Sequence, residues 1–243
     1  TPTMTSTPTP SATPTQTATP TPSPTATATA TPPPKPVYLP VALAERCDRE
    51  RRASDVALVI DASTSMLEDG GTGRTKMAAA LAASRSFLDL MNLAGGRDRA
   101  AIVSFNADAT IHEPLTADRA RLDLALAAIQ PAPLTCLPCA VDAGRTALGG
   151  PTAGRTRTMI VLTDGRSNPR PIGEAVARAA DAKADGILIA TVGLGTDLDL
   201  DGLRAIATSD QHFFQSPDAR DLEAIYAAIA SLIPCPSYWP QAP

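Results

Sequence analysis

Three oxygen-bearing side chains stand at alternate positions directly after an apolar run of the sequence. Asp61, Ser63 and Ser65 form an Asp-x-Ser-x-Ser motif behind segment 55–60, which reads Asp-Val-Ala-Leu-Val-Ile. A carboxylate and two hydroxyls are hard ligands that suit Mg²⁺, Mn²⁺ or Ca²⁺ better than a soft metal. The spacing therefore predicts a site for one divalent cation, with Mg²⁺ as the expected ion.

Two later segments add oxygen ligands to the same predicted site. Thr135 ends the turn-rich stretch 131–135 and precedes a helical segment, and Asp164 follows the strand-like run 157–163. Open α/β sheets bind their ligands at the carboxyl edge of the parallel strands. We therefore expect Thr135 and Asp164 to converge with the Asp-x-Ser-x-Ser motif on one metal centre.

The elements that must position these residues alternate along the chain. Apolar runs that do not alternate with polar residues, such as 187–192, are typical of strands covered on both faces. Apolar residues that recur every three or four positions indicate amphipathic helices. The sequence predicts strands at 55–60, 99–105, 108–113, 157–163, 186–192 and 211–214, and helices at about 75–93, 117–129, 138–148, 173–184, 200–207 and 218–232.

This alternation predicts a doubly wound α/β domain with a mostly parallel sheet. Segment 108–113 follows the preceding strand at hairpin distance, so we place it as an antiparallel edge strand. The length of 243 residues and the hydrophobic content of 44% suit one well-packed domain with an appendage. The net charge of −4 gives no electrostatic footprint for nucleic acid, and no stretch is apolar enough to span a membrane.

The appendage is the amino-terminal stretch 1–46, which is rich in Thr, Pro and Ala and carries no charged residue before position 35. Such a composition cannot bury a core, so we predict a disordered, extended linker. It is either a surface stalk, with O-glycosylated threonines, or an inert spacer between domains. The folded domain is expected at 47–235, followed by a short tail at 236–243.

Four cysteines fall into two pairs. Cys47 precedes the first strand and Cys235 follows the last helix, so we predict a disulfide that closes the whole domain. Cys136 and Cys139 directly follow Thr135, where a short-loop disulfide would stiffen the predicted metal loop, and a redox role is the alternative. Paired cysteines favour an extracytoplasmic location, secreted or on the cell surface.

Residues 53–233 resemble the von Willebrand factor type A (vWA) family. The resemblance rests on Asp61-x-Ser63-x-Ser65, on Thr135, and on Asp164 within Leu-Thr-Asp-Gly. It implies a Rossmann-like fold with a metal-ion-dependent adhesion site, in which the hydroxyls bind the cation directly and the aspartates often act through water. It also implies an open coordination position for an Asp or Glu side chain of a protein partner.

The sequence departs from the family pattern next to Thr135. The family commonly has Gly-Gly before this threonine and often Asn after it, whereas Pro133-Leu134 precede it here and Cys136 follows. We therefore expect a stiffer loop than is usual for the family. Specificity for a partner is expected from the acidic loop 67–74 or from Arg166 and Arg170. For the loop, capping of the next helix is the alternative, and for the arginines simple solvation.

These observations favour a non-enzymatic adhesion or protein-recognition module. The alternative is a structural subunit of a larger surface assembly that holds no exchangeable ligand. An enzyme is disfavoured because a nucleophilic serine needs a positioned base. The chain has no Gly-x-Ser-x-Gly motif, and neither His112 nor His212 maps to the predicted rim.

Overall fold

Six strands form one sheet in the computed structural model, which describes residues 53–234. The strand order across the sheet is β3-β2-β1-β4-β5-β6. Neighbouring strands are parallel except for the antiparallel pair β2 and β3. The predicted fold class, including the antiparallel edge strand, is confirmed. The strands are β1 (Ser54–Asp61), β2 (Arg99–Phe105), β3 (Ala109–Thr116), β4 (Thr156–Thr163), β5 (Ile187–Leu194) and β6 (Phe213–Ser216).

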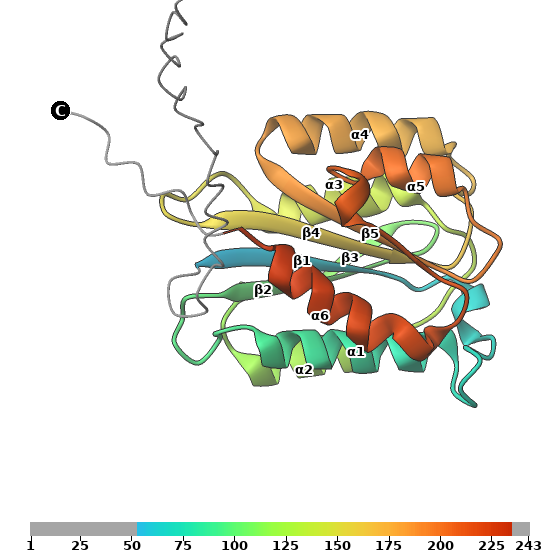
Figure 1. Ribbon diagram of the computed structural model, residues 1–243, viewed down its shortest axis with the longest axis horizontal. Helices are drawn as coiled ribbons and strands as arrows, with labels where there is room; N and C mark the ends of the chain where they lie inside the picture. Colours follow the sequence, from blue (N-terminus) through green and yellow to red (C-terminus); the bar gives the residue numbers. More distant parts are fainter. Residues whose placement is uncertain (1–52, 235–243) are drawn as a thin grey trace, which may run out of the picture. The chain divides into compact units, whose positions relative to one another are not determined.

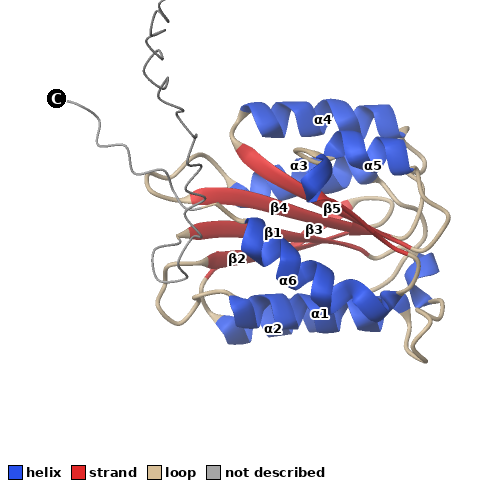
Figure 2. Cartoon of the chain, in the orientation of Figure 1, coloured by secondary structure: helices blue, strands red, loops and turns tan. Residues whose placement is uncertain are grey.

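Helices cover both faces of the sheet, as Figure 1 shows by position and Figure 2 by type of structure. On one face lie α1 (Lys76–Leu90), α2 (Arg119–Ala127) and α6 (Leu222–Leu232). On the other face lie α3 (Leu137–Leu148), α4 (Ile172–Ala184) and α5 (Leu200–Ile206). Short 3-10 turns occur at η1 (Thr64–Leu67), η2 (Asp210–His212) and η3 (Ala219–Asp221).

The central strand β1 is buried along its whole length and sends alternate side chains into two cores. Val56, Leu58 and Ile60 belong to the core beneath α1, α2 and α6. Ala57 and Val59 belong to the core beneath α3, α4 and α5. Because both faces are covered, the strand reads as a continuous apolar run rather than as an alternating one. Burial on both faces fixes the position of β1 and therefore the position of the residues at its carboxyl end.

The two cores are closed by specific packing contacts. The rings of Phe87 in α1 and Tyr226 in α6 meet edge to face, with 5.8 Å between their centroids. On the other face α3 lies unusually close to the sheet at Gly144. A Cβ atom at Gly144 would lie 2.9 Å from the sulfur of Met159 and 3.0 Å from Val59. Close packing of α3 therefore fixes the position of the segment that leads into it.

The amino edge of the sheet is held by charged residues. The buried carboxylate of Asp55 accepts hydrogen bonds from Arg99 and Arg155, with N–O distances of 2.7 to 2.9 Å. Burial raises the pKa of Asp55, but these two guanidinium groups outweigh it and hold the pKa below its usual value. This network lies at the opposite edge of the sheet from Asp61, the last residue of β1.

Several element boundaries differ from the sequence prediction, and three of the differences have a clear local cause or concern a candidate residue. The prediction of His212 in a strand is wrong, because this residue ends the 3-10 turn η2 and β6 begins at Phe213. The last helix begins at Leu222 after η3 rather than at 218, since Asp218 caps that turn through the backbone N–H of Arg220. The first helix ends at Leu90 rather than at about 93.

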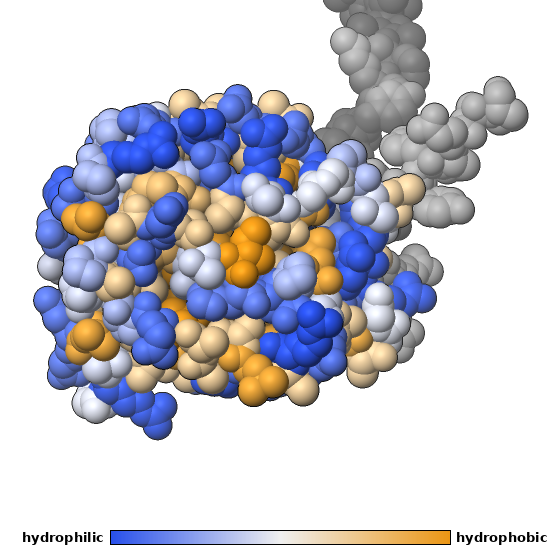
Figure 3. All heavy atoms as spheres, turned by 180° about the vertical axis from the view of Figure 1, so that it is seen from behind, coloured by the Kyte–Doolittle hydropathy of each residue, from blue (hydrophilic) through white to orange (hydrophobic). Residues whose placement is uncertain are grey.

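The described surface is mixed in character. On the face shown in Figure 3, hydrophobic side chains appear in separated groups among hydrophilic ones. No helix within residues 53–234 is long and apolar enough to cross a membrane. The predicted linker at 1–46, the Cys47–Cys235 disulfide and the tail at 236–243 lie outside the described residues.

Candidate metal centre

The predicted ligands gather at the carboxyl edge of the parallel strands, on the right in Figure 1, where the cyan turn η1 follows β1. Strands β1 and β4 are direct neighbours, with Ile60 paired to Leu162. Their ends therefore bring Asp61 next to Thr163 and Asp164, although about 100 residues separate them in the chain. The central position of β1 and β4 in the sheet explains why the motif lies at this point.

Asp61 is fully buried and organises the start of the loop that follows β1. One carboxylate oxygen accepts a hydrogen bond of 2.7 Å from the backbone N–H of Ser63, and the other accepts one of 2.6 Å from the hydroxyl of Thr163. Burial raises the pKa of Asp61 to about 6, against the lowering effect of these hydrogen bonds, and the charge of Asp164 adds to the rise. The site thus concentrates negative charge that a cation would relieve.

The two serines of the motif and Asp164 meet directly. The hydroxyl oxygens of Ser63 and Ser65 lie 2.9 Å apart. The hydroxyl of Ser65 donates to Oδ1 of Asp164 at 2.7 Å, and that of Ser63 approaches the same oxygen at 3.4 Å. Ser63 and Asp164 are buried, whereas Ser65 is half-buried and faces the opening. Oxygen atoms from two separated segments therefore meet at one point.

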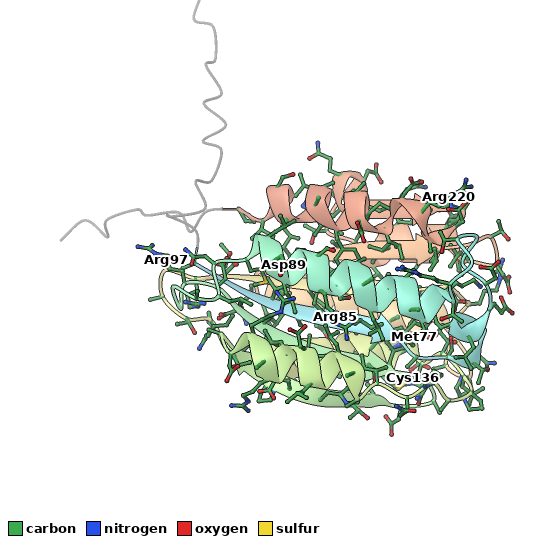
Figure 4. All side chains as sticks on the ribbon, turned by 90° about the horizontal axis from the view of Figure 1, so that it is seen from below. Met77, Arg85, Asp89, Arg97, Cys136 and Arg220 are labelled. Carbon is green, nitrogen blue, oxygen red and sulfur yellow. A yellow bond between two sulfur atoms is a disulfide. The ribbon has the colours of Figure 1, made fainter. Side chains whose placement is uncertain are left out.

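Thr135 joins this cluster through a tightly bound loop. Its backbone N–H and C=O form a reciprocal pair of hydrogen bonds with Asn168, at 2.9 and 2.8 Å, in the segment that follows Asp164. The next residue, Cys136, donates its N–H to the carbonyl of Asn106 at 2.6 Å. Its side chain forms a disulfide with Cys139 at the start of α3, which agrees with the structural interpretation of this pair. Figure 4 shows Cys136 towards the same end of the domain as Met77, which follows the first residue of α1.

A pocket with a volume of about 550 Å³ opens over the cluster. Ser63, Ser65, Thr135 and Asp164 line it, while Asp61 lies beneath them. Residues 53–234 contain no group of three or more His, Cys, Asp or Glu side chains placed to hold a metal. The candidate centre instead combines hydroxyls with two carboxylates, an all-oxygen set that fits a hard divalent cation.

Two residues that act on this site were not predicted from the sequence. Thr163 donates its hydroxyl to Asp61, and its place directly before Asp164 was the available signal. Lys76 pairs through Nζ with Oδ2 of Asp164 at 2.9 Å and with Glu68 at 2.8 Å. A cation at the first position of a helix opposes the helix dipole, and this anomaly was the signal for Lys76.

The residues expected to give partner specificity are bound within the chain. Arg166 lines the pocket and pairs with Asp197 at 3.0 Å, and Arg170 pairs with Glu174 one helical turn further on. Loop 67–74 is held by backbone hydrogen bonds. The carbonyl of Glu68 accepts from the N–H of Lys76, and the carbonyl of Gly70 accepts from the N–H of Ala219. Of these residues, Arg166 and Glu68 reach the pocket.

Leu134 adopts a left-handed backbone conformation, with φ of 78°, at the lip of the pocket. This conformation costs an L-residue about 1–2 kcal/mol, which glycine avoids. The vWA family, which the sequence resembles, commonly has glycine at this position before the threonine. We expect Leu134→Gly to unfold with a free energy about 1 kcal/mol higher than Leu134→Ala. Urea denaturation of the two variants measures the difference. Both variants lose the outer carbons of Leu134 and differ only in the Cβ atom, so equal stability would contradict strain at this position.

The doubly wound fold and the oxygen-lined pocket at its carboxyl edge define a class of α/β domains with a site suited to a hard cation. The chain belongs to the von Willebrand factor type A domain family, because the sequence model of that family matches residues 55–228. That match covers nearly all of the described residues. It places all six strands and most of α6 within the family's domain.

Individual proteins are similar to this chain in sequence or in fold. A UPF0353 protein of Mycolicibacterium paratuberculosis is 31% identical over 153 residues, which are 58% of this chain but only 44% of that protein. The proximal thread matrix protein 1 of the mussel byssus, with a zinc-occupied MIDAS motif, superposes with a TM-score of 0.66 at 21% identity over 75% of this chain and 46% of its own. The vWF domain of the type V pili tip protein Mfa5 from Porphyromonas gingivalis gives 0.64 at 18% identity, over 75% of this chain and 95% of its own.

Proposed function

We propose that the domain binds a divalent cation through five residues and uses it to hold an Asp or Glu side chain of a protein partner. The five are Asp61, Ser63, Ser65, Thr135 and Asp164, and Mg²⁺ is the expected ion, with Mn²⁺ and Ca²⁺ as alternatives of similar preference. The observation that carries the proposal is the meeting of the Ser63 and Ser65 hydroxyls with Asp164 in a pocket that also contains Thr135. The mussel protein with a zinc-occupied MIDAS motif supports it.

Each of these residues has a definite task in the proposed site. Asp61 holds the backbone of Ser63 and adds buried negative charge, while Ser63, Ser65 and Thr135 present neutral oxygens. When bound, the cation supplies positive charge and an open position for a carboxylate. The three hydroxyls add no charge, and the ammonium of Lys76 offsets part of the charge of the two aspartates, so the loaded site keeps positive charge that attracts the acidic side chain of a partner.

We further propose that the domain spans residues 47–235 and acts outside the cytoplasm, as an adhesion or assembly module displayed on the linker at 1–46. The Cys136–Cys139 disulfide supports an oxidising compartment. The similarity to a pilus tip domain supports a role at a surface. The competing proposal is a structural subunit in which the cation supports stability and no exchangeable ligand is bound.

An enzymatic role has little support at this pocket. The hydroxyls of Ser63 and Ser65 contact each other and Asp164. The rings of His112 and His212 are bonded to other serines, Ser104 and Ser209. Neither serine of the pocket therefore has an imidazole base beside it.

The experiment is a peptide array in which each Asp- or Glu-containing peptide is paired with its Asn or Gln counterpart. We expect the purified chain to bind acidic peptides in Mg²⁺ and to lose that binding in EDTA. Calorimetry of the chain with Mg²⁺ alone measures cation binding separately. Cation binding without any preference for acidic peptides would favour the structural alternative, and peptide binding that persists in EDTA would contradict metal-mediated recognition.

A further inference from the structure

Lys76 places a positive charge inside the candidate metal centre. Its ammonium lies 2.9 Å from Oδ2 of Asp164 and 2.8 Å from Oε2 of Glu68. The side chain of Asp164 has no exposed surface, that of Lys76 is 15% exposed and that of Glu68 is 67% exposed. Water screens the outer pair with Glu68 far more than the inner pair with Asp164. Lys76 therefore acts electrostatically on Asp164.

The contact divides the two oxygens of Asp164 between different partners. Oδ1 receives the hydroxyls of Ser65 and Ser63, whereas Oδ2 faces Lys76. The ammonium thus fixes which oxygen points towards the hydroxyl cluster. A lysine at the first position of α1 is unfavourable for the helix itself, because the positive end of the helix dipole lies there. At this position its side chain lines the pocket and reaches Asp164.

We propose that Lys76 makes the metal centre dependent on its partner, by weakening the binding of the divalent cation alone and strengthening the binding of a carboxylate to the cation-loaded site. This inference rests on the proposed function. Apart from Glu68, which is 67% exposed and screened by water, the charged groups of the centre are Asp61, Asp164 and Lys76, with one net negative charge. A divalent cation converts them to one net positive charge. Without Lys76 the loaded centre is neutral and attracts an anion less strongly.

The two effects have opposite signs, and a merely structural lysine would not produce this pattern. A structural role predicts that loss of Lys76 weakens both cation and carboxylate binding, because the site becomes less ordered. An electrostatic role predicts tighter cation binding and weaker carboxylate binding. A unit charge within the partly buried rim is expected to change each affinity by about tenfold.

The first measurement is Mn²⁺ binding to the full chain, followed by the electron paramagnetic resonance signal of free Mn²⁺. We expect Lys76→Met to bind Mn²⁺ about tenfold more tightly than the wild type. Lys183→Met is the matched control, since it removes the same charge from a lysine that binds the carbonyls of Ala205 and Ala207 at the end of α5. Lys76→Arg retains the charge and is expected to stay close to the wild type. Circular dichroism and thermal unfolding verify that each variant is folded.

The second measurement is the binding of N-acetyl-aspartate amide to the Mn²⁺-loaded chain, followed by the relaxation rate of water protons. We expect Lys76→Met to bind this carboxylate about tenfold more weakly, and Lys183→Met to resemble the wild type. Equal or weaker Mn²⁺ binding by Lys76→Met overturns the inference, and so does undiminished carboxylate binding. Neither result contradicts the proposed metal centre. Absence of Mn²⁺ binding in both the wild type and Lys76→Met overturns the proposed function together with the inference.

Discussion

Asp61→Asn is expected to lower the affinity of the domain for Mg²⁺ on the order of 100-fold and to abolish metal-dependent partner binding, while the domain stays folded. The substitution removes one of the two carboxylates of the centre. The amide oxygen of Asn can still accept the hydrogen bond from the N–H of Ser63. Its amide N–H₂ can donate to the hydroxyl oxygen of Thr163, whose own hydrogen then turns to the carbonyl of Gly165, 3.3 Å away. The buried donors therefore keep partners.

Asp61→Ala is the informative contrast to this variant. It removes the acceptor for both buried donors, and each unsatisfied donor costs about 1–3 kcal/mol. We expect this variant to lose Mg²⁺ binding and stability together, whereas Asp61→Asn loses the first alone. Calorimetric titration with Mg²⁺ and urea denaturation separate the two quantities. If Asp61→Asn retained the wild-type affinity for Mg²⁺, Asp61 would not be part of the metal centre.

Much of the fold could be predicted because local patterns of apolar residues indicate the strands and helices. The apolar run before Asp61 indicated a strand covered on both faces, and β1 is buried along its whole length. The short segment behind β2 indicated an antiparallel edge strand, which is β3. Boundaries were harder because they depend on local hydrogen bonds. The ring of His212 bonds to the hydroxyl of Ser209, three residues earlier, and this contact belongs to a turn rather than to a strand.

The candidate site was predicted from the ends of elements, since side chains at the carboxyl ends of neighbouring parallel strands must meet. The structure brings Ser63, Ser65 and Asp164 into contact and places Thr135 on the same pocket. Lys76 could not be predicted in the same way. It lies 88 residues from Asp164 in the chain, and the two charges meet because α1 shares a core with residues of β1 and β4.

The sequence around Thr135 differs from the usual family pattern, and the backbone there has an unusual conformation. The backbone is fixed on both sides of Leu134, because Ala132 donates its N–H to the carbonyl of Ala62 at 2.8 Å and Thr135 is paired with Asn168. Leu134 joins these two fixed points with a positive φ. The sequence predicted a stiffer loop from the proline and the cysteine, but it gave no indication that Leu134 would carry the strained conformation.

The stability of the metal-free domain is expected to fall as the pH rises from about 4 to about 6. The pKa of Asp61 is raised to about 6 in the folded state, whereas an unfolded aspartate titrates near 3.8. Within that window the folded domain binds more protons than the unfolded chain, so removal of protons favours unfolding. The shift corresponds to about 3 kcal/mol for this buried group. Urea denaturation in EDTA at several pH values measures the slope.

Asp61→Asn is the control, because it retains the buried polar group and cannot ionise. The lowered pKa of Asp55 acts in the opposite direction but below pH 4, where stability is lost as the pH falls. The lowered pKa values of His112 and His212 make stability rise with pH near 6.5 and below. Both variants share these contributions, so the difference between the wild type and Asp61→Asn isolates Asp61. An identical pH dependence in the two proteins would contradict the raised pKa. Since a cation binds the ionised carboxylate, Mg²⁺ is expected to stabilise the wild type more at pH 7 than at pH 4.5.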